Sequence, residues 1–323
     1  MTPTLVASRT ALPPEGALAP GGGPAALVPA ERQFGVGIIG VGNMGAAMAE
    51  RLARLGWQPW VYDIIPAKAQ NLERFGAVAL VDTTHIAIET VAIVICVVDA
   101  AQTREVLFGA QGIALQLRPG QVVVLCPTIS PQDVGDIAQR LHELGVGVLD
   151  CPMSGGPVRA REGTMSLMVA GADAAFETCS DLLKALSSQV FRIGARVGDA
   201  ARTKLVNNLL AGINLVGAAE VLALAGRLGL DQTRTLDVIA QSSGQSWIGL
   251  DRMRRAVAGD LAPRAHMTLL AKDTGLAQDC ARSVGFDSPM GALASQVFAA
   301  AVQAGLADLD DAALLQFLEH PSS

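Results

Sequence analysis

A lysine and an asparagine four residues apart are the first side chains here whose types and spacing suit a reaction. Lys204 and Asn208 fall in a stretch of helical period, so this separation places them on one face of a helix. Their neighbours Leu205, Val206 and Leu209 are apolar, and partial burial lowers the pKa of a lysine. Such a lysine can exchange a proton with a substrate hydroxyl while the asparagine orients that oxygen. The alternative is an ordinary solvated helix lysine.

Ser154, Gly155 and Gly156 form a second candidate site, because they follow an apolar run, Val146 to Leu149, that reads as a strand. A serine hydroxyl and the backbone amides that two glycines leave accessible can surround one anion, such as a carboxylate. Ligands collect where the strands of an open α/β sheet end, and this loop falls at such a place. The sequence therefore predicts a substrate-carboxylate loop, with a structural turn as the alternative.

The segment from Gly40 to Gly45 has the pattern G-x-G-x-x-G and lies between an apolar strand and a stretch of helical period. The first glycine of this pattern permits a tight turn, the second lets a pyrophosphate approach the backbone, and the third lets helix and strand pack closely. Free amides at the start of the following helix can hold the phosphates. In this context the pattern predicts dinucleotide binding.

Asp63 follows the next apolar run, Trp57 to Tyr62, and lies 18 residues beyond Gly45. An acid near this position accepts hydrogen bonds from the ribose diol of NAD, and its charge repels the 2′-phosphate of NADP. We therefore expect NAD as the cofactor. NADP is the alternative, because Lys68 is close enough in the sequence to attract a phosphate.

The elements that must position these residues alternate along the chain. Short runs of Val, Ile and Leu read as strands, with helix-like segments between them. This alternation predicts an α/β fold with an N-terminal Rossmann-type, doubly wound parallel sheet. After Gly198 no convincing strand follows, and Asp199 to Leu228 reads as one long helix, so we expect an all-helical C-terminal domain. The expected strands are Phe34 to Ile39, Trp57 to Tyr62, Val91 to Val98, Gln121 to Leu125 and Val146 to Leu149.

Three segments are therefore expected: a disordered tail over residues 1–34, a dinucleotide-binding domain over 35–197, and a helical substrate and dimerisation domain over 198–323. The tail is rich in Pro, Gly and Ala and has no amphipathic period, which is typical of disorder. The remaining length is enough for two domains, since 323 residues exceed the usual size of one.

Composition argues against several partners. The net charge of −6 and the pI near 5.3 lack the basic excess of a nucleic-acid-binding surface. No uninterrupted apolar run approaches the roughly 18 to 20 residues of a membrane span. The five cysteines show no C-x-x-C spacing, which favours a reducing cytoplasm. The four histidines lack metal-ligand spacing, so no metal is expected, and Ser154 lacks the G-x-S-x-G pattern of a serine hydrolase.

Together these segments resemble the 3-hydroxyisobutyrate dehydrogenase (β-hydroxyacid dehydrogenase) family, from about Phe34 to the C-terminus. The resemblance rests on four motifs that occur in the family's order. They are Gly40 to Gly45 as the cofactor loop, Asp150 to Gly156 as the substrate loop, Lys204 to Asn208 as the catalytic helix, and Lys272-Asp273 as a late cofactor-contacting pair.

The resemblance implies an NAD(P)-dependent dehydrogenase that acts on the CH–OH group of a small hydroxycarboxylic acid. It makes Lys204 the general acid/base and Asn208 its neighbour at the substrate. Members of the family pair through their helical halves, which implies a homodimer or homotetramer. Substrate contacts are implied for Ser154, Gly155, Gly156 and Thr128, and cofactor contacts for Gly40, Gly42, Asn43, Met44, Gly45, Asp63, Val97, Val98, Thr103 and Lys272.

Two departures and two alternatives accompany this prediction. Pro127 replaces the first serine of the family's S-T-I-S-P element, which removes a hydroxyl and an amide donor and leaves substrate choice open. Ala211 replaces a glutamate of the related 6-phosphogluconate dehydrogenases, so decarboxylation of that type is not expected.

Ser243 to Trp247 resembles the L-threonate dehydrogenase branch. An imine reductase, which generally lacks a lysine at the position of Lys204, and a catalytically silent NAD(P)-binding module are the alternatives.

Overall fold

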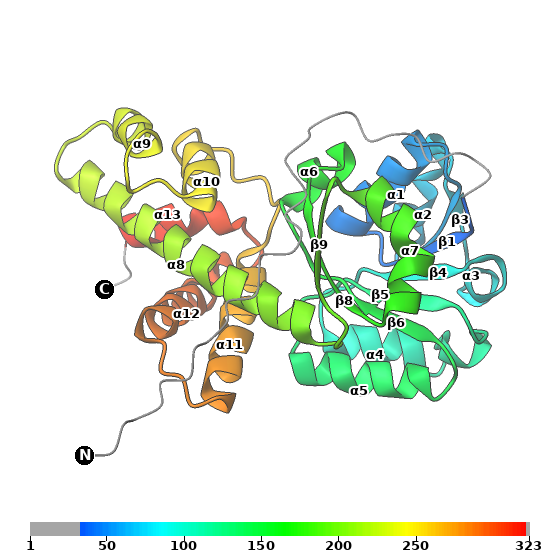
Figure 1. Ribbon diagram of the computed structural model, residues 1–323. Helices are drawn as coiled ribbons and strands as arrows, with labels where there is room; N and C mark the ends of the chain where they lie inside the picture. Colours follow the sequence, from blue (N-terminus) through cyan, green and yellow to red (C-terminus); the bar gives the residue numbers. More distant parts are fainter. Residues whose placement is uncertain (1–32, 321–323) are drawn as a thin grey trace, which may run out of the picture.

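The computed structural model describes residues 33–320, and within them a sheet with flanking helices lies beside a bundle of helices (Figure 1). The predicted tail lies almost entirely outside the described residues. The sequence changes in composition near Gly198. One long helix begins there and runs from the first part into the second.

Six strands form the parallel part of the sheet, in the order β3-β2-β1-β4-β5-β6. The inner strands are short apolar runs buried on both faces, as expected where helices cover both sides of a sheet. The strand order reverses direction between β1 and β4, which is where open α/β sheets bind ligands. The strands are β1 (Val36–Ile39), β2 (Pro59–Tyr62), β3 (Val78–Ala79), β4 (Ala92–Ile95), β5 (Val122–Leu125) and β6 (Gly147–Asp150).

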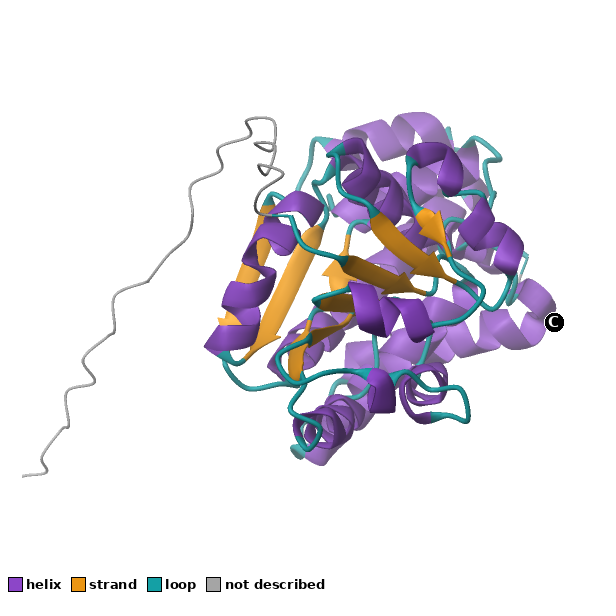
Figure 2. Ribbon diagram, turned by 90° about the vertical axis from the view of Figure 1, so that its right-hand side faces the viewer, coloured by secondary structure: helices purple, strands orange, loops and turns teal. Residues whose placement is uncertain are grey.

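Helices cover both faces of this sheet (Figure 2). Two hydrophobic clusters mark the two faces: one includes buried residues of α1, α6 and α7, and the other those of α3, α4 and α5. The helices of this part are α1 (Asn43–Arg54), α2 (Pro66–Gln70), α3 (Thr84–Glu89), α4 (Ala100–Phe108), α5 (Pro131–His142), α6 (Gly156–Glu162) and α7 (Asp173–Leu186), with short 3-10 turns η2 (Glu73–Phe75) and η3 (Ala114–Gln116).

The doubly wound, parallel-dominated sheet that the sequence predicts is confirmed, and the sheet continues beyond the predicted strands. Strand β8 (Ser166–Gly171) pairs antiparallel with β6 and with the two-residue β7 (Met153–Ser154), and parallel with β9 (Gln189–Gly194). The sequence analysis missed β8 and β9, and β3 and β7 are too short to give a periodic signal. The edge of the sheet next to the helical part is therefore mixed.

The helical part is built around α8 (Asp199–Arg227), whose first half also packs against β8, β9 and α5. Its core includes Leu215, Leu222, Met253, Met267 and Phe298, contributed by four helices. The elements after α8 are α9 (Gln232–Ala240), α10 (Trp247–Val257), α11 (Met267–Ser283), α12 (Pro289–Ala301), the π-helical turn η4 (Val302–Leu306), the 3-10 turn η5 (Asp311–Ala313) and α13 (Leu314–Glu319).

Helix α8 deserves comparison with a membrane span, because its length and a mean hydropathy of 1.8 over 18 residues would allow it to cross a bilayer. It is the one such helix among residues 33–320. The core helix of a soluble protein passes the same test, and α8 carries Lys204 and Glu220 within its length. In this fold it is the helix against which α10, α11, α12 and α13 pack.

Candidate active site

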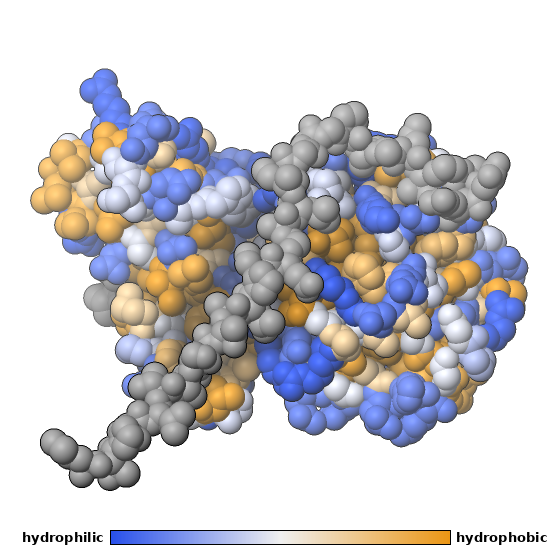
Figure 3. Space-filling model, viewed as in Figure 1, coloured by the Kyte–Doolittle hydropathy of each residue, from blue (hydrophilic) through white to orange (hydrophobic). Residues whose placement is uncertain are grey.

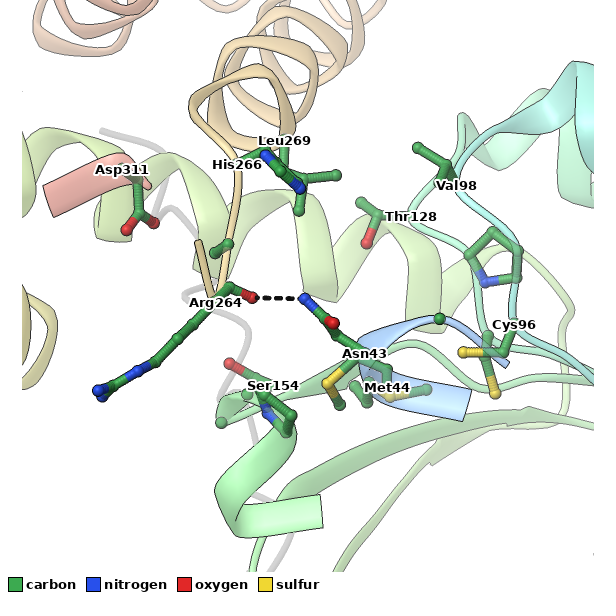
Figure 4. Close-up of a pocket in the computed structure, with 18 of the residues that line it drawn as sticks. Asn43, Met44, Cys96, Val98, Thr128, Ser154, Arg264, His266, Leu269 and Asp311 are labelled. Carbon is green, nitrogen blue, oxygen red and sulfur yellow. Dashed lines mark hydrogen bonds between the residues drawn. The ribbon is translucent and has the colours of Figure 1, made fainter. Parts of the chain in front are cut away.

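A cleft of about 980 Å³ lies where the sheet and the helical part meet, and Figure 4 shows part of its lining. Segments far apart in the sequence form it: the loop before α1, the ends of β4 and β5, the loop after β6, one face of α8, and the segments that lead into α10 and α11. Twelve of the predicted site residues line it: Gly42, Asn43, Met44, Val97, Val98, Thr128, Ser154, Gly155, Gly156, Lys204, Asn208 and Lys272.

Gly40 and Gly45 do not line the cleft but give the loop before α1 its shape. Gly40 has φ of +89°, in the left-handed region that favours glycine. A Cβ on Gly45 would lie 2.0 Å from the carbonyl oxygen of Gly40, so α1 can approach β1 this closely only with a glycine there. By contrast, a Cβ on Gly42 would meet no atom within 4 Å and would point into open space.

The start of α1 fits the pyrophosphate of a dinucleotide. Gly42 is the N-cap, and no side chain caps the first turn of α1, so the amides of Asn43 and Met44 can bind an anion. The open space beside Gly42 gives a phosphate access to this backbone. These are properties of the backbone that a dinucleotide site requires.

Asp63 lies just after β2 and is mostly buried. Its Oδ2 accepts a hydrogen bond from the amide of Val41 (2.9 Å), and its Oδ1 accepts one from the amide of Ile65 (2.9 Å). It therefore ties the glycine loop to the end of β2. Each carboxylate oxygen has a second lone pair, so these two bonds leave acceptor capacity for a ribose hydroxyl.

Thr103 lies away from the cleft. It is fully buried in the first turn of α4, and its hydroxyl donates to the carbonyl of Asp99 (2.7 Å). Val97 and Val98, which the resemblance groups with it, do line the cleft. The structure therefore separates Thr103 from Val97 and Val98.

Lys204 is a buried titratable group of the cleft, with only 7% of its surface exposed. Burial lowers the pKa of Lys204 from 10.5 to about 8; the charge of Asp273 opposes this shift and the charge of Lys272 adds to it. Lys204 makes no side-chain hydrogen bond with another described residue, so its amine is available to a molecule in the cleft. A lysine with such a pKa can act as a proton acceptor near neutral pH.

Asp273 organises the polar groups around Lys204. Its Oδ2 accepts from the Asn208 amide (2.6 Å), and its Oδ1 accepts from the Lys272 ammonium (2.7 Å). Lys272 also donates to the carbonyl of Thr128 (2.5 Å), so it joins α11 to the sheet domain. The sequence paired Lys272 with Asp273 but gave no sign that Asp273 bonds Asn208, because 65 residues separate the two.

Asp150 fixes α8 to the end of β6. Its Oδ2 accepts hydrogen bonds from the amides of Gly198 (2.9 Å) and Ala201 (2.9 Å), at the start of the helix. Burial raises the pKa of Asp150 to about 6, and these backbone hydrogen bonds oppose the shift. The substrate-loop strand and the helix that carries Lys204 are therefore held together by one buried carboxylate, a contact that the sequence did not reveal.

The Ser154 loop and a contact between the two domains complete the cleft. Gly155 and Gly156 have φ of +126° and +74°, which explains why two glycines follow Ser154. On the opposite side, the Asn43 amide donates to the carbonyl of Arg264 (3.4 Å), across the two domains (Figure 4). The Thr128 side chain is also directed into the cleft (Figure 4). Within residues 33–320, no group of three or more His, Cys, Asp or Glu side chains could hold a metal ion.

Two family models match the chain. One, described as the NAD binding domain of 6-phosphogluconate dehydrogenase, matches residues 35–194. The other, described as NAD-binding of NADP-dependent 3-hydroxyisobutyrate dehydrogenase, matches residues 198–318. The two matches adjoin at the start of α8.

Curated relatives and a solved structure agree with these models. The chain is 36% identical over 285 residues to L-threonate dehydrogenase of Escherichia coli K12, covering 88% of this chain and 94% of that protein. It is 31% identical over 290 residues to human mitochondrial 3-hydroxyisobutyrate dehydrogenase, covering 88% and 86%. A crystal structure of 3-hydroxyisobutyrate dehydrogenase from Salmonella typhimurium matches with a TM-score of 0.83 and 38% identity, covering 88% of this chain and all of that one.

Proposed function

Because this chain belongs to the 3-hydroxyisobutyrate dehydrogenase family, we propose that it oxidises a small hydroxycarboxylic acid with Lys204 as its general acid/base. Membership makes it an NAD(P)-dependent dehydrogenase that acts on CH–OH groups, as the sequence predicts. L-threonate and 3-hydroxyisobutyrate, named for its relatives, define the class of substrate. One observation supports the role of Lys204 above others: it is a buried lysine in the same cleft as the Ser154 loop, and its amine makes no hydrogen bond with any side chain or backbone group of residues 33–320.

In the oxidising direction Lys204 accepts the proton of the substrate hydroxyl. With a pKa of about 8, a fraction of the lysine is neutral at pH 7 and ready to accept it. Asp273 holds the Asn208 amide by its nitrogen, which fixes the orientation of that side chain beside the reacting oxygen. A bound nicotinamide supplies the hydride acceptor. In the reducing direction the protonated lysine returns the proton.

The loop from Ser154 to Gly156 binds the substrate carboxylate in this proposal. Its positive φ angles turn the backbone so that a hydroxyl and glycine amides border the same part of the cleft. Ala211 lines the cleft near the reacting groups and carries no acid. This favours simple hydride transfer over the oxidative decarboxylation of 6-phosphogluconate dehydrogenases.

NAD is the proposed cofactor. Asp63 is linked to the glycine loop through Val41 and carries a negative charge at the end of β2, where a 2′-phosphate of NADP would meet it. Lys68 and Arg74 line the same end of the cleft and are the groups that would bind NADP instead.

We also propose that the chain forms a homodimer or homotetramer through its helical domain. Figure 3 shows apolar side chains on the surface of both parts of the molecule, the helical part included. Contiguous exposed apolar surface of this kind is typical of a subunit interface. On α8 and α12 the exposed apolar residues outside the cleft include Val206, Val221, Leu224, Met290 and Leu293.

Initial rates test the chemical proposal. The unmutated protein should reduce NAD in the presence of L-threonate, D-glycerate or 3-hydroxyisobutyrate. Lys204→Ala should lower turnover about a hundredfold or more while leaving NADH binding intact, because general acid/base catalysis contributes that much. Lys184→Ala, on the exposed side of α7, is the matched control and should change neither quantity.

Two other outcomes point elsewhere. Full turnover in Lys204→Ala contradicts the role of the lysine and reopens the imine reductase alternative. NADH binding without turnover of any acid by the unmutated protein supports a silent NAD(P)-binding module.

A further inference from the structure

An ion pair lies at the helical end of the cleft and takes no part in the chemistry described above. The Arg252 Nε donates to Asp311 Oδ1 at 2.5 Å, joining α10 to η5. Both residues line the cleft, although only 13% of the Arg252 side chain and 2% of the Asp311 side chain are exposed. Asp311 lies on the opposite side of the cleft from Cys96 and Val98, at the ends of the sheet (Figure 4).

This pair keeps unused hydrogen-bonding capacity. Arg252 bonds Asp311 through Nε and Asp251 through Nη1, but its Nη2 makes no hydrogen bond with a described residue. Asn214, which lines the same end of the cleft, makes no side-chain hydrogen bond with a described residue. Together with the Asp311 carboxyl, these groups give the same cleft lining both donors and acceptors, which is what a hydroxyl group requires.

Charge at this end of the cleft disfavours a second anion. Arg252 and Arg264 line the cleft and are both paired, with Asp311 and with Asp260 (2.6 Å) respectively, and Arg255, outside the lining, pairs with Asp310 (3.1 Å). Asp251 and Asp308 add two more negative charges to the same region. Burial raises the pKa of Asp311 to about 7, so this carboxyl carries only part of its charge at neutral pH. A carboxylate or phosphate would still meet more acids than arginines beside Arg252.

We propose that Arg252 and Asp311, with Asn214 beside them, form a subsite for the hydroxyl-bearing tail of a polyhydroxylated monocarboxylic acid. This inference rests on the proposed function, because the carboxylate end of the same substrate occupies the Ser154 loop. The subsite selects a tail with hydroxyl groups over an apolar tail and over a tail that ends in a second acid.

The physical basis of this selection is the cost of leaving buried polar groups without partners. An apolar tail would cover Arg252 Nη2 and the Asp311 carboxylate while offering no hydrogen bond. A site built to bond a hydroxyl discriminates strongly against an analogue that lacks it, whereas an apolar pocket discriminates weakly. The pair should therefore change the ratio of kcat/KM for two substrates and not the rate of hydride transfer itself.

Three acids and one double variant test the subsite. L-threonate and L-tartrate share a four-carbon skeleton but end in a hydroxyl and a carboxylate respectively, and 3-hydroxyisobutyrate has an apolar methyl group and no second hydroxyl. The variant Arg252→Met/Asp311→Leu replaces both charges with apolar groups, so it leaves no single buried charge unpaired. The measurement is kcat/KM for each acid with NAD.

The unmutated protein should prefer L-threonate to L-tartrate by about a hundredfold or more. In the double variant, kcat/KM for L-threonate should fall about thirtyfold or more, while that for 3-hydroxyisobutyrate changes less than about threefold. The matched control is Arg254→Met/Asp237→Leu, which removes an exposed ion pair (3.3 Å) between α9 and α10 outside the cleft and should leave all three values unchanged.

If the double variant does not fold, Arg252→Lys gives the same test with the charge retained and the forked geometry lost. Its threonate-to-hydroxyisobutyrate ratio should fall about tenfold. Equal losses for the two acids, an unchanged ratio, or L-tartrate turnover equal to that of L-threonate contradict the subsite while leaving the proposed function standing. If the unmutated protein oxidises none of the acids, the proposed function fails and the subsite with it.

Discussion

The two sides of the cleft are built by different means. On the sheet side, the glycine loop is a continuous segment whose geometry depends on its backbone. Gly40 has a positive φ, Gly42 has open space beside it, and Gly45 allows α1 to pack closely on β1. On the helical side, Lys204 depends on side chains that come from other elements, above all Asp273 on α11. A change to the backbone of the glycine loop should therefore affect cofactor binding as a whole. A change to one side chain on the helical side should affect only the contacts of that side chain.

The largest effect should follow from a change on the backbone side. In Gly45→Ala, the new Cβ would lie 2.0 Å from the carbonyl oxygen of Gly40, so α1 must move away from β1. We expect NADH affinity to fall about a hundredfold or more, since the helix N-terminus no longer meets the pyrophosphate. Titration of NADH fluorescence measures this loss.

The control for this change is Gly135→Ala in α5, where a Cβ would meet nothing within 4 Å. It should leave NADH affinity unchanged, since alanine is the better helix former. Gly45→Ala should also lower turnover of every hydroxy acid by the same factor. Selective loss of one substrate would show that the two sides of the cleft are not separate in the way described.

A smaller and more selective effect should follow on the side-chain side. Asp273→Asn removes the charge that raises the pKa of Lys204 and loosens the contacts of Asn208 and Lys272. We expect kcat to fall about tenfold to a hundredfold with NADH affinity nearly unchanged, because the catalytic groups are displaced and the glycine loop is not. Steady-state kinetics and NADH titration separate the two quantities.

The pH dependence of oxidation tests in which direction Asp273 shifts the pKa of Lys204. Lys204 must lose its proton to act as a base, so kcat/KM for oxidation should rise with pH and level off above about 8. Asp273 favours the charged lysine, and its neutralisation should therefore move this midpoint to lower pH. Asp279→Asn, on the exposed side of α11, is the control and should leave the midpoint in place. A midpoint that stays the same in Asp273→Asn contradicts the assignment of the titration to Lys204.

The same contrast explains what the sequence could predict. The positions of the glycine loop and the Ser154 loop could be predicted because each is a local pattern next to a strand. That Lys204 and Asn208 lie on one helix face could be predicted from their spacing. The contacts of Asp150 with α8 and of Arg252 with Asp311 gave no signal, because the partners are 48 or more residues apart and only the fold brings them together.

Thr103 and β8 show what a local sequence pattern does not reveal. Thr103 was assigned by resemblance of position alone, and the structure instead buries it in α4 with its hydroxyl bonded to the preceding turn. Strand β8 is an apolar run long enough to be a strand, but only its pairing with β6 reveals that it is antiparallel. Pairing direction depends on the path of the whole chain, which a local pattern does not contain.

The smallest predicted effect concerns the choice between NAD and NADP, which we expect to depend on the Asp63 side chain next to the glycine loop. Asp63→Asn removes the charge that repels a 2′-phosphate but keeps an oxygen that can accept from the Val41 amide. The ratio of kcat/KM for NADP to that for NAD should rise about tenfold, helped by Lys68 at the same end of the cleft. Asp82→Asn is the matched control, because Asp82 also accepts from a backbone amide two residues on, in an exposed turn, and should leave the ratio unchanged. A ratio unmoved by Asp63→Asn would mean that its carboxylate only supports the glycine loop, and that the backbone side of the cleft sets affinity without selecting between the two cofactors.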